Sequence, residues 1–211
     1  MSQKNLALAG IVAPIMFVVI VIVLGIIDSD FSFSSDAVGV LGASGADYPL
    51  IMNVVGYVVV GLLFIPFALG LHRGINSGDG SRFAPVMLGI SGAAWAGMGL
   101  FPGNVSNIVT FAHSVMVLLT FGAGSIALLR LAVRFQTDDY WTQYRAPTYA
   151  FAFLTIGNTL IPPGGIKQLF MMALYLGWIE GAALLLYRRP AEISARSDTE
   201  SGETEEVQTG E

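Results

Sequence analysis

Residues 5–27 read NLALAGIVAPIMFVVIVIVLGII and contain no charged side chain. A helix needs about 20 apolar residues to cross the hydrocarbon core of a membrane, and this stretch supplies them. Three further windows carry no Asp, Glu, Lys or Arg: residues 48–71, 83–129 and 146–166. The pattern therefore predicts a multi-pass integral protein of the cell membrane.

The composition excludes several classes of protein. Of the 211 residues, 54% are hydrophobic and 12% are charged, whereas a soluble domain carries about 25% charged residues. The absence of cysteine excludes disulfides, a thiol nucleophile and a zinc–thiolate site, and two histidines are too few for a multi-histidine metal site. The net charge of −5, with dispersed basic residues, excludes a basic nucleic-acid-binding face. We therefore predict no metal, no cofactor and no nucleic-acid partner.

The hydrophobic pattern fits six helices. The window 83–129 is too long for one span, and Pro-Gly-Asn at 102–104 divides it. Pro147 suits a helix start because the first helical turn does not need its missing N–H. The predicted helices cover residues 6–27, 49–71, 84–101, 108–131, 147–162 and 168–187. The predicted fold class is an all-α integral membrane protein with six transmembrane helices.

Orientation follows from the distribution of Lys and Arg, which favour cytoplasmic loops. One side of the predicted topology receives nine basic residues and the other receives Lys167 alone. The nine are Lys4, Arg73, Arg82, Arg130, Arg134, Arg145, Arg188, Arg189 and Arg196. Both termini are therefore predicted to be cytoplasmic. The first apolar stretch exceeds the 7–15 residues of a signal-peptide core, so we expect it to be retained.

Two segments outside the helices have distinct compositions. Residues 191–211 are polar and acidic without aromatic residues, which predicts a disordered cytoplasmic tail after a membrane domain at 1–190. The first outer loop, Asp28 to Asp47, is rich in apolar residues, and we expect it to fold over the helix ends with Phe31 and Phe33 buried. The scarcity of lysine and the pI of about 4.9 suggest a halophilic archaeal or bacterial source as a hypothesis.

Several short motifs occur in a characteristic order. They are Leu41-Gly42-Ala43 in the first outer loop, Asn53, Gly61-Leu62-Leu63, Phe101-Pro102-Gly103 and His113. Their order and spacing over about residues 5–187 resemble the DUF998 family of six-span prokaryotic membrane proteins and, more distantly, the Frag1/DRAM/Sfk1 proteins. The resemblance implies a six-span fold with a structured first outer loop and no settled activity. The family pattern has a serine two residues before Leu41-Gly42, where this chain has Gly39, so no role is transferred to the nearby Ser34 and Ser35.

Two ionisable residues lie inside the predicted spans, where each is costly and asks for an explanation. His113 lies about 9 Å from the outer end of the fourth helix, at 1.5 Å per residue. Glu180 lies near the middle of the sixth helix. Burial disfavours the charged carboxylate, so we expect Glu180 to face the bundle in protonated form. It would donate a hydrogen bond to a hydroxyl at similar depth, namely that of Ser91, Thr120 or Thr155.

Other polar residues gather toward the outer end of the predicted bundle. An outward-opening ligand pocket is one interpretation, and its candidate residues are Asn53, Asn104, Asn107, His113, Asn158 and Asp36. The alternative is that the asparagines cap helix ends and hydrogen-bond between helices, as membrane bundles often do. No nucleophile, base and acid occur at a telling spacing, so no catalytic residue is predicted.

Small residues crowd three of the predicted helices and indicate close helix packing. They include Gly89, Gly92, Gly97, Gly99, Gly122, Gly124, Gly177 and Gly181. The aromatic residues Tyr140, Trp141, Tyr144 and Tyr187 fall where an aromatic belt at the inner membrane interface would lie.

Three functions follow from these patterns. We favour a non-enzymatic protein that binds membrane lipids or another hydrophobic ligand, or that serves as a small subunit of a larger membrane complex or homo-oligomer. A second hypothesis is a proton- or cation-coupled transporter that uses Glu180. A third is a lipid-modifying enzyme with His113 as general base and Asp36 as the group that orients it.

Overall fold

A computed structural model describes residues 2–75, 81–159 and 164–189 of the chain. The helices are α1 (Gln3–Ile27), η2 (Ile51–Val59) continuing into α2 (Val60–Arg73), α3 (Phe83–Leu100), α4 (Asn107–Arg134), α5 (Arg145–Thr159) and α6 (Gly165–Arg188). No strand occurs among the described residues, so the prediction of an all-α fold is confirmed. The predicted disordered tail at 191–211 lies outside the described residues.

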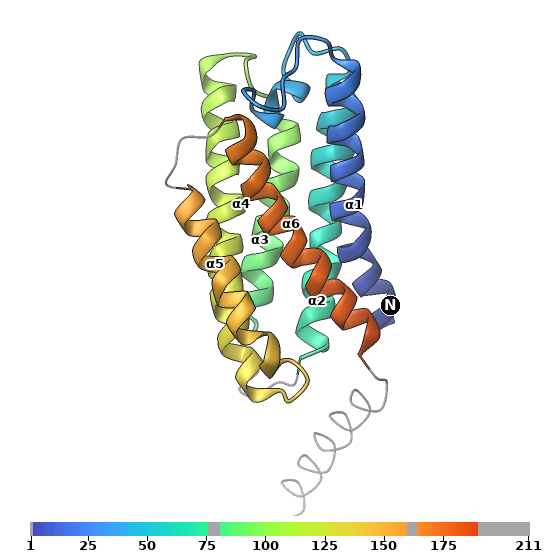
Figure 1. The fold of residues 1–211 in the computed structure, drawn as a ribbon, viewed down its shortest axis with the longest axis vertical. Coiled ribbons are helices and arrows are strands. Elements are labelled where there is room, and N and C mark those ends of the chain that lie inside the picture. The colour runs from blue at the N-terminus through green and yellow to red at the C-terminus, as the bar shows by residue number, and fades with distance from the viewer. Residues whose placement is uncertain (1, 76–80, 160–163, 190–211) are drawn as a thin grey trace, which may run out of the picture.

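The helices pack in chain order into a closed bundle (Figure 1). Each helix contacts the next along the chain, and α6 returns to pack against α1. In Figure 1, α6 crosses the front of the bundle on a diagonal, and α5 ends well short of the upper ends of α1 and α4. The chain start and the end of α6 lie at the same end of the bundle.

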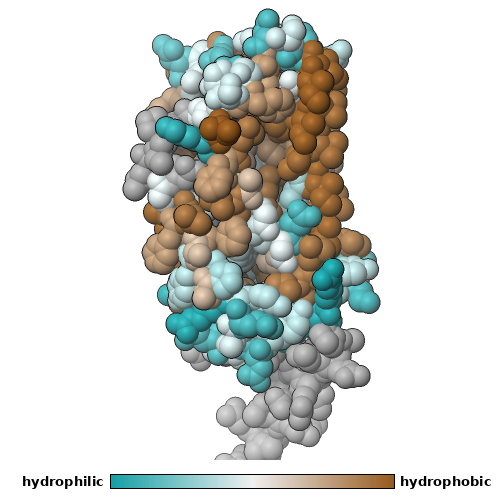
Figure 2. Space-filling model, in the orientation of Figure 1, coloured by the Kyte–Doolittle hydropathy of each residue, from teal (hydrophilic) through white to brown (hydrophobic). Residues whose placement is uncertain are grey.

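Five helices in the described part of the chain are long and apolar enough to cross a membrane. They are Gln3–Ile27, Ile51–Arg73, Phe83–Leu100, Asn107–Thr137 and Gly165–Arg188. The helix predicted at 147–162 is instead α5, which has 15 residues and is therefore about 22 Å long. That length falls short of the ~30 Å hydrocarbon core. Figure 2 shows an apolar surface that runs along α1, at the right of the view, as a membrane-spanning helix requires.

Glycines bring α2 and α3 together. A Cβ atom built on Gly92 would lie 2.6 Å from the Cβ of Phe64, and one on Gly61 would collide with the backbone of α3. Farther along, a Cβ on Gly124 would lie 2.6 Å from the Tyr175 hydroxyl. Glycine is required at these positions because any larger residue would force the helices apart. The prediction of close packing is confirmed for Gly92 and Gly124.

The segment at residues 28–49, which we call the lid, folds over one end of the bundle. It contains the short helix η1 (Val38–Gly42), with Val38 and Leu41 buried. Phe31 is 8% exposed, whereas Phe33 is only half-buried and packs against Gly25 of α1. The prediction of a folded loop is therefore confirmed, with Phe33 less buried than expected.

Two hydrogen bonds join the lid to the start of α6. The Val38 N–H donates to Oε1 of Gln168 at 2.8 Å, and the Gly165 N–H donates to the carbonyl oxygen of Asp36 at 3.1 Å. We call this end of the bundle the loop end. The opposite end, which carries residues 73–75, 134–145 and 188–189, is called the basic end.

Candidate functional site

Of the predicted asparagines at the loop end, only Asn53 is seen to bond a distant backbone group through its side chain among the described residues. Nδ2 of Asn53, which is 8% exposed, donates to the carbonyl oxygen of Gly42 in the lid at 2.8 Å. Asn104 adopts a positive φ of 63°, and its carbonyl oxygen accepts from the Ser44 hydroxyl at 3.1 Å. Asn107 is exposed in the first turn of α4. The side chain of Asn158 lies outside the described residues.

His113 lies beneath the lid. Its Nδ1 is 2.9 Å from the carbonyl oxygen of Phe101, and its ring meets the Tyr57 ring edge-on at 6.3 Å between centroids. A Cβ atom built on Gly39 would lie 3.4 Å from Nε2 of His113. Because a carbonyl oxygen can only accept, the Phe101 contact places the proton on Nδ1 and leaves the Nε2 lone pair facing the lid.

Asp36 does not orient His113, so this part of the enzyme hypothesis is wrong. One carboxylate oxygen of Asp36 accepts from the Ser32 N–H at 2.8 Å, and the other accepts from the Ser35 hydroxyl at 3.4 Å. These are local bonds that shape the lid. The group that orients His113 is a backbone carbonyl, and no residue pattern in the sequence predicts such a contact.

Glu180 lies on the flank of α6 and is half-buried. It has no hydrogen bond to any described residue. Of the three predicted partners, the Ser91 and Thr155 hydroxyls bond elsewhere, and the Thr120 hydroxyl is buried without a partner among the described residues. The Ser91 hydroxyl donates to the Thr120 carbonyl at 2.7 Å and lies 2.6 Å from the Tyr175 hydroxyl, while the Thr155 hydroxyl donates to Phe151 at 2.8 Å. The predicted hydrogen bond is therefore wrong, because Tyr175 of α6 occupies the inward position that we expected Glu180 to take.

The sequence did not predict an aromatic groove between α5 and α6 near the basic end. The groove has a volume of about 260 Å³. Its walls include Trp141, Tyr144, Phe151 and Trp178, with Gly177 and Gly181 of α6 also lining it. The Trp178 indole N–H donates to the Thr148 hydroxyl at 3.1 Å and so joins α6 to α5 across the groove. The two tryptophans Trp141 and Trp178 could have indicated this groove. From the sequence only Trp141 was assigned a position, and it was assigned to the aromatic belt at the membrane interface.

One wall of this groove is held rigidly. The Trp141 ring stacks on Phe135 with 4.8 Å between centroids and a 19° interplanar angle. Its indole N–H donates to the carbonyl oxygen of Gly74 at 2.8 Å. The wall is thereby tied to the end of α2.

A buried ion pair lies behind that wall. Arg189 and Asp138 are separated by 3.1 Å, and both side chains are almost completely buried. Asp138 also accepts from the backbone N–H groups of Tyr140 and Trp141 at 3.0 and 3.3 Å. Arg134 is buried as well and donates to the carbonyl oxygens of His72 and Ile75, each at 3.1 Å. The basic end therefore contains three buried charged side chains, Asp138, Arg134 and Arg189, in addition to its exposed arginines.

A positive charge adjoins the groove residue Tyr144 in the sequence. Arg145 is exposed at the first residue of α5, where the helix dipole also places partial positive charge, and it lies 5.7 Å from the Tyr149 ring. Nearby, the Tyr140 hydroxyl donates to the carbonyl oxygen of Leu185 at 2.9 Å. Burial, and to a lesser extent neighbouring Tyr144, raise the pKa of the Tyr140 hydroxyl above its ordinary value.

Comparison with known proteins bears on the whole bundle. The family model described as a protein of unknown function, DUF998, matches residues 11–187. The chain belongs to the DUF998 family. This confirms the predicted resemblance to the DUF998 family, and the family description assigns no activity. No curated protein and no solved structure gives a match.

In this DUF998 protein, the motifs that carried the resemblance meet in space. Asn53 bonds to Gly42, and His113 bonds to Phe101, so four separate motif positions form two contacts at the loop end. Each motif alone is weak evidence for the family, but the fold brings these residues into contact with one another.

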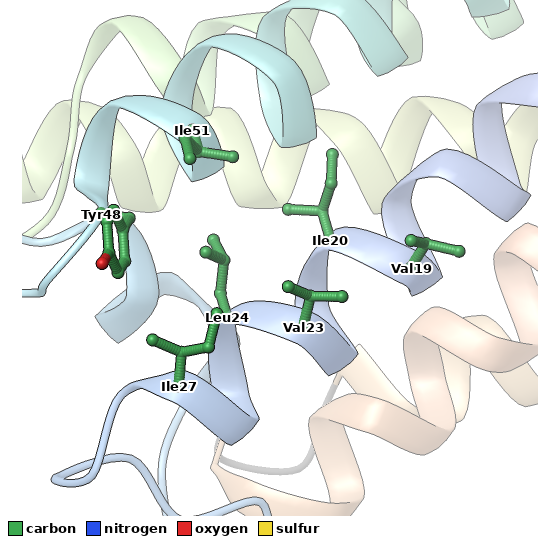
Figure 3. Close-up of a pocket in the computed structure, with 7 residues that line it drawn as sticks. All are labelled: Val19, Ile20, Val23, Leu24, Ile27, Tyr48 and Ile51. Atoms are coloured by element: carbon green, nitrogen blue, oxygen red, sulfur yellow. The ribbon is translucent and has the colours of Figure 1, made fainter.

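The DUF998 chain has a second apolar groove, between α1 and η2 (Figure 3). Its volume is about 210 Å³, and Figure 3 shows aliphatic side chains of α1 facing Ile51 and Tyr48. No polar surface lines this groove, so it offers nothing that would select one lipid over another.

Proposed function

We propose that this protein is a non-enzymatic membrane protein that binds an anionic phospholipid through the aromatic groove at its basic end. The observation that carries the proposal is the groove itself, which is apolar and partly aromatic, with the exposed Arg145 directly after its lining residue Tyr144. Ligand sites typically combine an apolar lining with a few placed polar groups. An acyl chain would lie between α5 and α6, and Thr148 and Tyr144 are the polar side chains within reach of the glycerol region.

An anionic headgroup is favoured by the charge next to the groove. Arg145 is exposed, follows the lining residue Tyr144 and is the first residue of α5. A helix N-terminus and an arginine together suit a phosphate group. A zwitterionic lipid could make the same phosphate contact. Its positive headgroup amine would be repelled by Arg145, so it should bind less tightly than an anionic lipid.

The proposal includes the orientation of the chain. Nine of the ten Lys and Arg residues belong to the basic end or its tail, which by the positive-inside rule would face the cytoplasm, with α5 as a shortened sixth span. Cysteines placed at Asp47 and Lys167 should then react with an impermeant reagent from outside, and those at Arg82 and Asp139 should not. Asp139 is exposed, whereas the neighbouring Asp138 is buried and unsuitable for labelling. Reversed accessibility would overturn the orientation.

The lipid proposal is tested with the three tryptophans of the chain. Trp141 and Trp178 line the groove, whereas Trp95 is buried in the bundle core and does not line the groove, so it serves as an internal control. In nanodiscs, phosphatidylglycerol with brominated acyl chains should quench the groove tryptophans several-fold more than brominated phosphatidylcholine at equal mole fraction. In a Trp141→Phe, Trp178→Phe variant that retains only Trp95, quenching should be nearly absent.

Arg145→Gln tests binding of the lipid headgroup separately from binding of the acyl chain. It should remove most of the preference for the anionic lipid while leaving quenching by phosphatidylcholine unchanged. Equal quenching by the two lipids in the unmodified protein would overturn the anionic specificity. Quenching no greater than that of the Trp95-only variant would show that no acyl chain enters the groove.

A further inference from the structure

Two polar side chains beneath the lid have no role in the lipid-binding proposal. His113 of α4 donates through Nδ1 to the carbonyl oxygen of Phe101, so the neutral ring presents the lone pair of Nε2 to the lid. A Cβ atom built on Gly39 would lie 3.4 Å from this Nε2 and 3.9 Å from the hydroxyl of Tyr57. Polar atoms from two helices therefore converge at a point of the lid where Gly39 has no side chain.

The Tyr57 side chain is only 2% exposed, yet its hydroxyl makes no hydrogen bond to any described residue. A buried hydroxyl in that state costs free energy, so a partner is to be expected. The ring cannot turn away, because it packs against Phe17, Trp95 and His113 with 6.0, 6.4 and 6.3 Å between ring centroids. The missing partner must therefore come to the hydroxyl.

The backbone that carries Tyr57 is unusual. Tyr57 belongs to η2, which is a π-helix of nine residues. Such helices are rare, are mostly limited to a single turn, and occur frequently at functional sites. Asn53, one buried polar residue of η2, is bonded to Gly42 of the lid, whereas Tyr57 is left without a bond. One polar side chain of η2 thus attaches the lid, and the other is available to a ligand.

We propose that Tyr57 and His113 bind a hydroxyl group of a polyol, either a free polyol or the headgroup of a lipid. A hydroxyl both donates and accepts, so one such group can donate to Nε2 of His113 and accept from Tyr57. A phosphate or carboxylate oxygen without a proton would instead face the Nε2 lone pair, and an ammonium would offer the Tyr57 proton no acceptor. Gly39 and His113 are each half-buried, so the rest of the ligand can remain outside the bundle.

Nuclear magnetic resonance of the histidines tests the site directly, because the chain has only two of them. The full-length protein, with ¹⁵N-labelled histidine, is placed in nanodiscs of phosphatidylcholine, whose headgroup has no hydroxyl. Added glycerol, or phosphatidylglycerol in place of part of the lipid, should move the Nε2 resonance of His113 saturably. His72 at the basic end is the internal control and should not respond to glycerol. A response to glycerol alone assigns a soluble polyol, one to phosphatidylglycerol alone assigns a lipid headgroup, and one to both supports either source. A response to neither would mean that water alone occupies the position, and it would overturn the proposal.

Substitution in the lid tests the position of the ligand. Gly39→Ser supplies a hydroxyl from the chain itself, so the Nε2 resonance of His113 should be displaced without ligand and should no longer respond to the probes. Gly103→Ser is the matched control at the same end, because a Cβ atom there would meet no heavy atom within 4 Å, and it should keep the response. A full response in Gly39→Ser would overturn the assigned position.

Substitution of the tyrosine tests the second contact. Tyr57→Phe keeps the ring packing and should weaken the apparent affinity for the responding probe several-fold, as expected for the loss of one neutral hydrogen bond. Tyr48→Phe, at an exposed tyrosine of the same end, should not weaken it. Unchanged affinity in a Tyr57→Phe variant with unchanged thermal unfolding would overturn the role of this hydroxyl. Arg145→Gln should leave the His113 response intact, so this proposal and that of the lipid groove can fail separately.

Discussion

The two ends of the bundle use polar residues in opposite ways. At the basic end, Asp138 and Arg189 are buried, and Asp138 also accepts hydrogen bonds from two backbone groups. At the loop end, the lid is attached through single hydrogen bonds, such as that from Val38 to Gln168. Oδ1 of Asn53 is buried there without a partner among the described residues. The basic end is thus a locked platform beneath the proposed lipid site, whereas the loop end is a cover with buried apolar residues and only neutral polar attachments.

The difference has a physical cause. A buried charge that loses its partner is strongly destabilising, so a set of buried charges holds together as a unit. A neutral hydrogen bond contributes only about 0.5–1.5 kcal/mol net, so the loss of one polar attachment of the lid costs less than the loss of one partner of the buried charges. Substitutions at the two ends should therefore differ in magnitude and in how far their effects spread.

The largest expected effect is that of Asp138→Ala. It leaves the Arg189 guanidinium buried without its carboxylate and removes the acceptor of the Tyr140 and Trp141 N–H groups. We expect a loss of about 3–5 kcal/mol in the free energy of unfolding. Equilibrium unfolding in a mild detergent measures this loss. A change below about 1 kcal/mol would show that the ion pair does not lock the basic end.

The next effect concerns the lid and should remain local. Gln168→Leu removes the acceptor of the buried Val38 N–H, at a cost of about 1–3 kcal/mol. Hydrogen exchange should accelerate across residues 31–42 while the basic end keeps its protection. Gln168→Glu retains an acceptor oxygen and serves as the control. Acceleration over the whole bundle would contradict the idea of a separately attached cover.

The comparison also shows which features a sequence can reveal. The uncharged windows predicted the long helices to within a few residues, because a membrane imposes length and apolarity on each span. Glu180 was expected to face inward, yet Tyr175 takes that position, because the rotation of one helix depends on its neighbours. The aromatic groove joins Trp141 to Trp178 from distant segments, and the burial of Asp138 depends on the same long-range packing. Such contacts leave no local pattern.

A smaller effect is expected where the lid meets His113. Gly39→Ser would place a Cβ atom 3.4 Å from Nε2 of His113, close enough for the new hydroxyl to donate to that nitrogen. We expect a gain of about 0.5–1.5 kcal/mol in lid stability, measured as slower hydrogen exchange. The gain should vanish when His113→Ala is added, as a double-mutant cycle would show. A loss of stability in the single variant would mean that the backbone cannot make room for the side chain.

The smallest effect is a pH dependence at the basic end. Burial raises the pKa of the Tyr140 hydroxyl in the folded protein, so the unfolded chain gives up this proton first as the pH rises. Folded stability from this group is therefore complete below pH ~10 and declines as the pH rises through the folded value. Thermal unfolding between pH 8 and 11 should show this decline, and Tyr140→Phe should make it shallower at the cost of the bond to Leu185. Tyr48→Phe at the loop end is the matched control and should leave the decline in place. If the pH dependence of thermal unfolding is the same in Tyr140→Phe as in the unmodified protein, the Tyr140 hydroxyl does not contribute to the decline.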